Sequence, residues 1–349
     1  MIRLILYLFY PLELLYRLGF WLALACRKRN ANEDQFPFKI ISVGNLSVGG
    51  TGKSVVVPFL VDILGRGAAA IVLRGYRGSL EREGRAALVG DGRATLVTRE
   101  QSGDEAMMYV EQLGIPVAVG AHRAQACKLL PPKIHYVVLD DAYQNYSVHK
   151  DVEILLLDAR APFDNGHCLP LGRLREKDYT RADIIILTHA DRVDIAAIEY
   201  TKNVQLKNFP REKIFTGKHA YAGLYRNNKD LVTPDDMKNK KFLVTAGVGS
   251  FEGFVTSVKN TEYVVGATKK YKDHHTYTAR DVGELYELMR QTQCDGIITT
   301  AKDWVKLESL LAHDKARKLP VFVMRVSFEL LTQNQQAELQ RILRVLLAE

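Results

Sequence analysis

The feature that most constrains this chain is the stretch of residues 38–54, which reads FKIISVGNLSVGGTGKS. An apolar, β-branched run leads into a glycine-rich turn and then into Gly52, Lys53 and Ser54. This order of strand, glycine loop and helix start is typical of a P-loop, which binds nucleotide phosphates with backbone N–H groups at the positive end of a helix. An ordinary glycine turn is the alternative, but the strand directly before the loop favours phosphate binding.

The P-loop pattern gives each side chain an expected role. Lys53 can reach the β- and γ-phosphates, and the Ser54 hydroxyl can ligate Mg²⁺. Ser47 departs from the usual G-x-x-x-x-G-K-[ST] pattern, because it holds the place of the first glycine. The predicted nucleotide-binding residues are Ser47, Val48, Gly49, Gly50, Thr51, Gly52, Lys53 and Ser54.

Strand and helix patterns alternate after the loop and predict a parallel sheet covered on both faces. The rhythm restarts near residue 220, which indicates a second, smaller α/β domain. Its glycine loop at residues 246–250 is either a second phosphate site or simple packing geometry. We therefore predict a P-loop NTPase-like α/β/α fold with an amphipathic helix at 1–30, a P-loop domain at 31–218, a linker hairpin at 219–230 and the smaller α/β domain at 231–349.

The first 26 residues are almost wholly apolar, and three basic residues follow at positions 27–29. A membrane-spanning helix needs roughly 20 consecutive apolar residues, whereas Pro11, Glu13 and Arg17 interrupt this run. On a helix Arg3, Glu13 and Arg17 share one face, and Glu13 and Arg17 have the spacing of an i,i+4 pair. We expect an amphipathic helix in a membrane interface, with its basic end toward anionic headgroups. A buried helix of the P-loop domain is the alternative.

Composition limits the compartment and the partners. The net charge of +8 suggests an anionic partner, which could be nucleic acid, anionic lipid or a phosphorylated substrate. The four cysteines, at positions 26, 127, 168 and 294, are far apart and form no CxxC pair. This spacing argues against a zinc site or a disulfide scaffold and suits a reducing cytoplasm.

Acidic residues follow the apolar strand at residues 136–139. Asp140 and Asp141 fit a Walker B element, whose carboxylate holds Mg²⁺ directly or through water; helix capping is the alternative. Arginines are suited to phosphate because the guanidinium binds it in bidentate fashion, although each alone could be a surface ion-pair partner. The ionisable residues on predicted strand-end loops are Arg74, Asp104, Arg123, Arg175, Glu176, His274 and His275.

Motifs along nearly the whole chain resemble those of the tetraacyldisaccharide 4'-kinases, the lipid A 4'-kinases of Gram-negative bacteria. They occur in the family's order, and the ordered set is far more specific than any one of them. The motifs are GNLSVGGTGKS (44–54), LRGYRG (73–78), GDEA (103–106), PVAVGAHR (116–123), VVLDDAYQNY (137–146), DVEILLLDA (151–159), NGHCLPLGRLRE (165–176), TAGVGS (245–250), KDHH (272–275) and TTAKDWVKL (299–307).

The resemblance implies an ATP- and Mg²⁺-dependent enzyme with a lipid substrate and no nucleic-acid partner. The γ-phosphate of ATP would go to the 4'-hydroxyl of a tetraacylated glucosamine disaccharide 1-phosphate. The enzyme would be a peripheral, monotopic protein on the cytoplasmic face of the bacterial inner membrane. The family's architecture, a P-loop α/β/α domain joined to a smaller α/β domain by a two-stranded linker, agrees with the predicted fold.

The resemblance also implies roles for particular residues. Asp104 would activate the sugar hydroxyl as a general base, and His274, or its neighbour His275, would pair with it when the domains close. The positions implied at the metal are Ser54, Asp140 or Asp141, and Glu176. The positions implied in the pocket for nucleotide and lipid phosphate are Arg74, Arg123, Gln144, Asn145 and Arg175.

Some positions depart from the family pattern, and other functions stay open. Ala142 and Asn145 stand where the family usually has glycine and histidine, and Asn145 can only form hydrogen bonds because it does not titrate near neutral pH. A regulatory P-loop ATPase or GTPase at the membrane is the main alternative, since residues 188–191 (THAD) faintly resemble a TKxD guanine-recognition motif without its lysine. A membrane-bound nucleotide sensor without catalysis is another.

Overall fold

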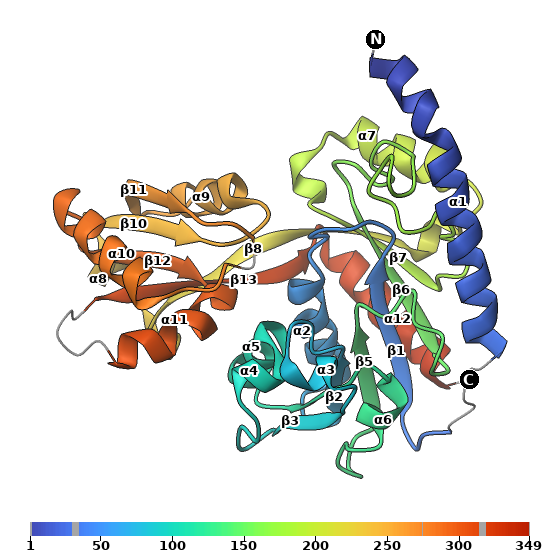
Figure 1. Cartoon of the computed structure of the whole chain (residues 1–349), viewed down its shortest axis with the longest axis horizontal. Helices are drawn as coiled ribbons and strands as arrows, with labels where there is room; N and C mark the ends of the chain where they lie inside the picture. The colour runs from blue at the N-terminus through green and yellow to red at the C-terminus, as the bar shows by residue number, and fades with distance from the viewer. Residues whose placement is uncertain (1, 30–34, 274, 314–318, 349) are drawn as a thin grey trace. The chain divides into compact units, whose positions relative to one another are not determined.

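The structure of the chain is a computed structural model that describes residues 2–29, 35–273, 275–313 and 319–348 (Figure 1). The chain divides into two compact units. Unit 1 comprises Met1–His219 and Phe328–Glu349, and unit 2 comprises Ala220–Ser327. The strands β8 (Ile214–Arg226) and β13 (Val321–Leu330) each contribute residues to both units, so the chain passes from one unit to the other within a strand.

Unit 1 is built on a sheet with the strand order β8-β7-β6-β1-β5-β2-β4-β3. Its central strand, β1 (Lys39–Asn45), lies between β5 (Tyr136–Asp140) and β6 (Val152–Asp158), parallel to both. The remaining strands are β2 (Ala69–Leu73), β3 (Ala87–Asp91), β4 (Pro116–Val119) and β7 (Ile184–Thr188). Of the described pairings in this sheet, β3 with β4 is antiparallel and the others are parallel. The predicted parallel α/β sheet is confirmed, and β3 is an addition to it.

Helices follow β1, β2, β4 and β7, whereas β5 leads to β6 and β6 to β7 without a helix between them. Residues 56, 57, 60 and 61 of the helix after β1 are buried, and this is the spacing of one apolar helix face. The helices of unit 1 are α1 (Ile2–Arg29), α2 (Lys53–Leu64), α3 (Ser79–Arg82), α4 (Arg99–Ser102), α5 (Asp104–Leu113), α6 (Arg123–Cys127), α7 (Ile195–Tyr200) and α12 (Gln333–Ala348). Short turns of 3₁₀- or π-helix occur at Ala190–Arg192, Thr201–Gln205 and Arg211–Lys213.

The C-terminal helix α12 belongs to unit 1, whereas we expected residues 231–349 to form the smaller domain. Its apolar stripe of Leu339, Ile342 and Leu343 is buried. At its start the Gln335 side chain accepts a hydrogen bond from the N–H of Thr216 in β8 at 2.7 Å. The chain therefore leaves unit 2 along β13, and the helix that follows, α12, packs in unit 1.

The N-terminal helix α1 runs along one side of unit 1 and stays helical through Pro11 (Figure 1). Its polar residue Glu13 is 1% exposed and contacts the loop of residues 165–177, whereas sequence spacing had suggested Arg17 as its partner. Leu15 and Trp21, by contrast, are 62% and 61% exposed. Glu13 on the polar side of this helix thus faces the protein, whereas Arg17 on the same side is exposed, and much of the apolar side faces outward. Within the described ranges, no helix is both long and apolar enough to cross a bilayer.

Unit 2 holds a parallel sheet with the strand order β11-β10-β12-β13. Its other strands are β9 (Asp230–Val232), β10 (Lys241–Ala246), β11 (Val264–Lys270) and β12 (Gly296–Thr300), and β9 pairs antiparallel with the end of β8. Its helices are α8 (Pro234–Met237), α9 (Phe251–Lys259), α10 (Ala279–Gln291) and α11 (Ala301–His313). A capping box between Thr278 and Asp281 begins α10, because each side chain accepts a hydrogen bond from the other's backbone N–H.

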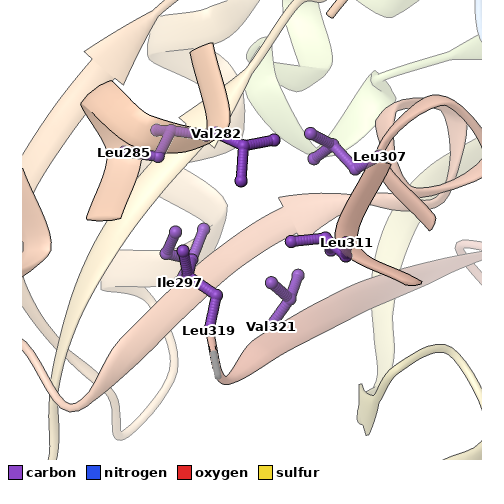
Figure 2. Close-up of a pocket in the computed structure, with 7 residues that line it drawn as sticks. All are labelled: Val282, Leu285, Ile297, Leu307, Leu311, Leu319 and Val321. Carbon is purple, nitrogen blue, oxygen red and sulfur yellow. The ribbon is translucent and has the colours of Figure 1, made fainter. Parts of the chain in front are cut away.

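The core of unit 2 is closely packed. Figure 2 shows apolar side chains from α10, α11, β12 and the start of β13 pointing toward one another. The cavity that they leave measures about 10 Å³, which is no more than the space of one small water-sized probe. The lining residues are Val282, Leu285, Ile297, Leu307, Leu311, Leu319 and Val321. This space is a packing gap and not a ligand site.

We expect Leu307→Ala to destabilise unit 2 by about 2–5 kcal/mol, because Leu307 is 2% exposed and its truncation would enlarge the cavity. Urea denaturation followed by the fluorescence of Trp304, which lies in the same core, measures the change. Leu231→Ala is the matched control, since Leu231 is 62% exposed and its loss should cost less than about 0.5 kcal/mol. Equal effects of the two substitutions would contradict this account of the core.

Candidate functional site

The glycine loop between β1 and α2 has the backbone shape that phosphate binding requires. Gly49 and Gly52 have φ values of 125° and 84°, a region that side chains with a Cβ rarely adopt. A Cβ on Gly52 would also lie 2.6 Å from Nε2 of His219, and a Cβ on Gly49 would overlap the Arg173 guanidinium. The loop leads into the N-terminus of α2, whose unpaired N–H groups and helix dipole favour an anion.

Lys53 and Asp141 form the centre of the site. The Lys53 Nζ lies 3.3 Å from an Asp141 oxygen and donates a hydrogen bond to Oδ1 of Asn45 at 3.2 Å. Asp141 also accepts from Nη1 of Arg175 at 3.3 Å. Burial raises the pKa of Asp141, but Lys53 and Arg175 outweigh burial and hold this pKa below its usual value. An ionised carboxylate therefore positions two cations beside the glycine loop.

Asp140 is a buried carboxylate at the end of β5, and only one of its two oxygens has a hydrogen-bond partner among the described residues. Its side chain is buried, and Oδ2 accepts a hydrogen bond from the Tyr109 hydroxyl at 2.9 Å. Among the described residues no hydrogen-bond partner reaches Oδ1. Burial and the nearby Glu105 carboxylate raise the pKa of Asp140 to about 6, although Lys53 partly opposes them. A buried carboxylate with a free oxygen fits Mg²⁺, which prefers oxygen ligands.

The carboxylates in this region do not amount to a complete metal cage. In the part of the chain that the structure describes, no group of three or more His, Cys, Asp or Glu side chains could hold a metal ion. This arrangement suits Mg²⁺, since one or two carboxylates together with substrate phosphates usually hold it. Ser54 is the second residue of α2, which places it at the same strand end as Asp140. Metal binding by Ser54, Asp140 or Asp141 stays a prediction.

Gln144 and Glu176 form hydrogen bonds beside the Lys53–Asp141 centre. The Gln144 side-chain amide donates to the carbonyl of Asn45 and to Glu176, both at 2.8 Å, and its oxygen accepts from Arg175 at 3.2 Å. Glu176 is 7% exposed, and both of its oxygens accept hydrogen bonds from Arg181, at 2.6 and 2.8 Å. The structure thus shows Glu176 as an anchor for Gln144, and its ligation of a metal stays a prediction.

The other predicted site residues occupy neighbouring loops and have protein partners. Arg123 is buried and donates to the carbonyl of Gly120 at 2.8 Å, while burial lowers its pKa to about 10. Arg74 forms an ion pair with Glu81. The Asn145 oxygen accepts from the Ser147 N–H at 3.0 Å and from its hydroxyl at 2.8 Å, so this side chain stabilises a local turn.

Asp104 begins α5, directly after Gly103, whose φ is 86°. Its carboxylate accepts a hydrogen bond from Arg99 at 3.4 Å and is 25% exposed. A Cβ on Gly103 would lie 2.6 Å from the carbonyl oxygen of Tyr76, so the loops 74–78 and 101–103 pack directly on each other. The structure thereby brings the LRGYRG and GDEA motifs together. His274 lies outside the described residues.

A groove of about 520 Å³ lies beside this centre. One wall is the α1 surface, lined by Leu14, Arg17, Leu18, Phe20, Trp21 and Leu24. The opposite wall is largely charged or polar and is lined by Tyr146, Cys168, Arg175, Glu176, Lys177, Asp178 and Arg181. Arg175 contacts Asp141 and also lines the groove, so it links the phosphate loop region to an amphipathic cavity.

Several contributing residues were missed by the sequence reasoning. Asn45 ends β1 directly before the glycine loop, and a polar residue at that position was a usable signal. Tyr109 could have been found as a polar residue on the first helix turns after the GDEA motif. His219 and Arg181 carried no signal, because their partners come close only in the fold.

Comparisons with known proteins agree with this architecture. The family model described as tetraacyldisaccharide-1-P 4'-kinase matches residues 5–347. The tetraacyldisaccharide 4'-kinase of Desulfatibacillum aliphaticivorans is 33% identical over 84% of this chain and 80% of its own. The enzyme of the same description from Geobacter sulfurreducens is 34% identical over 81% and 77%. A crystal structure of LpxK from Aquifex aeolicus, solved in complex with ATP, has a similar fold, with a TM-score of 0.75, 24% identity and coverage of 98% of this chain and 99% of that one.

We expect Lys53→Met to weaken the binding of Mg-ADP by about tenfold or more, because a charge-assisted contact to phosphate contributes roughly 1.5–3 kcal/mol. Isothermal titration calorimetry measures the affinity. Lys39→Met is the control, since Lys39 also pairs with an aspartate, Asp151 at 3.1 Å, but lies at the opposite end of β1. If both variants bound Mg-ADP like the unmodified protein, the assignment of the phosphate loop would be wrong.

Proposed function

Because this chain belongs to the tetraacyldisaccharide-1-P 4'-kinase family, we propose that it transfers the γ-phosphate of ATP to the 4'-hydroxyl of a tetraacylated glucosamine disaccharide 1-phosphate in lipid A synthesis. The observation that carries the proposal is the place of Arg175. It contacts the Asp141 carboxylate beside the phosphate loop and also lines a groove with one apolar wall. A kinase for an acylated sugar needs such a junction of nucleotide and lipid sites.

Side chains around the loop would bind and orient the nucleotide. Incoming phosphates would compete with Asp141 for Lys53, and the N–H groups of the glycine loop would receive the phosphate oxygens. Mg²⁺ bound with the nucleotide would neutralise charge on the β- and γ-phosphates. Asp140 would hold it through its unpaired oxygen, together with Ser54 and Asp141. Arg175, released from part of its contact with Asp141, could then face an anionic group in the groove.

Asp104 is our candidate for the general base. It lies at the N-terminus of α5 and accepts a hydrogen bond from Arg99. A carboxylate within hydrogen-bond reach of a sugar hydroxyl can orient it and accept its proton during transfer. We also propose that His274 assists Asp104, as the family resemblance implies; His275 accordingly remains the alternative. The described part of KDHH shows His275 at 3.3 Å from Asp281 and stacked on Tyr271.

The N-terminal helix supports a membrane location for the reaction. Its outward side presents a nearly continuous apolar surface, because Leu12, Leu14, Leu15, Leu18, Trp21 and Leu22 are between 46% and 62% exposed. Such a surface is large for a protein in water and is typical of contact with lipid. We propose that α1 rests on the cytoplasmic face of the bacterial inner membrane. The described cysteines 127, 168 and 294 are free thiols, which suits a reducing compartment.

The alternative of a regulatory ATPase or GTPase has less support. Asp191 is exposed, but guanine recognition by residues 188–191 would also require an exposed side chain at the lysine position of the TKxD motif. Instead His189 is 7% exposed, lies 3.3 Å from Asp158 and packs its ring against His219. The Thr188 hydroxyl donates to the carbonyl of Thr51 at 3.1 Å. Thr188 and His189 therefore help to hold the phosphate loop in place and are not available to a base.

We expect Asp104→Asn to lower kcat for transfer of labelled phosphate to the disaccharide lipid by about 100- to 10,000-fold, as loss of a general base does. Mg-ADP affinity should stay unchanged, because Asp104 does not bind phosphate in this scheme. Asp62→Asn is the matched control, since Asp62 also accepts hydrogen bonds from an arginine, Arg66, but is exposed at the end of α2. A folded Asp104→Asn enzyme with normal kcat would show that Asp104 is not the general base.

The proposed function has its own test. A folded unmodified protein that yields no 4'-phosphorylated lipid would overturn it.

For the membrane contact, Leu15→Glu should lower the fraction of protein that sediments with phosphatidylglycerol-containing vesicles. The partition coefficient should fall about tenfold or more, because burial of a leucine contributes about 1.5–3 kcal/mol. Ile195→Glu is the control. Ile195 in α7 is 79% exposed, so the same added charge at this position should leave sedimentation unchanged. Equal sedimentation of the two variants would contradict attachment through α1.

A further inference from the structure

Glu13 is a buried carboxylate on α1 that the proposed mechanism does not use. It is 1% exposed, and each oxygen has a partner in the loop of residues 165–177. Oε1 accepts from the Cys168 N–H at 2.9 Å and lies 3.4 Å from the Lys177 ammonium, while Oε2 lies 2.7 Å from Nδ1 of His167. Burial raises the pKa of Glu13, but these partners outweigh it and leave the pKa lowered.

A second contact fixes the same loop to α1 one helical turn further on. The Tyr16 hydroxyl donates to the carbonyl of Arg175 at 3.2 Å, and the ring packs against the core cluster that includes Cys168 and Leu174. The rings of Tyr10 and His167 also lie perpendicular to each other, with centroids 6.5 Å apart. One side of α1 therefore holds the loop at residues 167, 168, 175 and 177.

The opposite edge of this loop supports the phosphate loop. Arg173 donates from Nε and Nη2 to the carbonyl of Val48 at 3.1 and 2.8 Å, and its own carbonyl accepts from the Val48 N–H at 2.7 Å. The Arg175 N–H donates to the carbonyl of Leu46 at 2.7 Å. Residues 173–175 thus lie beside residues 46–48 like a short strand, and they set the position from which the glycine turn begins.

We propose that Glu13 is a positioning residue for the nucleotide site: through His167 and Cys168 it fixes the loop 165–177, and this loop holds Val48 and Asp141 in place for phosphate binding. The proposal rests on nucleotide binding by the glycine loop, as proposed above. Glu13 itself touches no phosphate. Its removal leaves the buried Cys168 N–H without a partner and frees the loop edge that carries Arg173 and Arg175.

The test measures Mg-ADP affinity by isothermal titration calorimetry on the full-length protein in detergent. Glu13→Ala should raise the Kd by about three- to tenfold, the size of effect expected within one hydrogen-bond network. Glu13→Gln keeps an oxygen that can accept from Cys168, so its Kd should lie between those of the alanine variant and the unmodified protein. A folded Glu13→Ala protein with an unchanged Kd would overturn the proposal.

Asp151→Ala is the matched control for a purely structural effect. Asp151 also accepts a hydrogen bond from a backbone N–H, that of Ile40 at 2.7 Å, and pairs with a lysine, but at the opposite end of β1. It should lower Tm and leave the Kd for Mg-ADP unchanged. If Asp151→Ala raised this Kd as much as Glu13→Ala at an equal loss of Tm, Glu13 would have only a structural role.

A double-mutant cycle with Arg173→Ala tests the route. If Glu13 acts through the loop, the Kd of the double variant should rise by less than the product of the two single effects. Simple multiplication of the two effects would contradict the route. Should Glu13→Ala fail to fold, Glu13→Gln and His167→Ala decide the question: a raised Kd in either supports the proposal, and unchanged values in both overturn it.

This readout is independent of lipid phosphorylation. If Mg-ADP binding depended on Glu13 but the protein yielded no phosphorylated lipid, the proposed function would be wrong and the role of Glu13 would be supported. If kinase activity were normal but the Kd for Mg-ADP did not depend on Glu13, the proposed function would be supported and the role of Glu13 would be wrong.

Discussion

The shared carboxylate of Asp141 is the contact on which the rest of the site depends. It lies at the end of β5, next to the central strand, and it holds Lys53 and Arg175 at the same time. Without this carboxylate the two positive charges would repel each other. Because the two cations come from segments more than a hundred residues apart, this ion pairing also joins the glycine loop to the loop that lines the groove. The charge around Arg175 is therefore coupled through Asp141 to the charge around Lys53.

The sequence predicted the parts whose signals are local. The glycine loop, the apolar strands and the acidic pair after β5 are each contained in a few consecutive residues, and the parallel sheet follows from their alternation. Glu13 shows where this reasoning stops. Helical geometry places it on a polar face, but whether that face meets water or protein depends on His167 and Lys177, which are far away in the chain. The same limit applies to α12, since only the path of β13 decides which unit it joins.

The orientation of α1 reverses the usual arrangement of an amphipathic surface helix. In most such helices the apolar stripe packs on the core and the charges face solvent. Here the buried Glu13 carboxylate and the Tyr16 side chain face the protein, and leucines and a tryptophan face outward. Polar contacts can hold a helix in this orientation because each buried group finds a partner. The apolar side is then free to contribute to the groove.

The sequence separation of these contacts sets an order of events during synthesis. Glu13 precedes His167 and Cys168 by 154 and 155 residues. At roughly 5–20 residues per second, the ribosome makes α1 on the order of 10 s before its docking loop exists. During that interval the helix has an unpaired carboxylate on one side and bare leucines on the other. Docking of α1 through Glu13 therefore has to wait until residues 167 and 168 have been made.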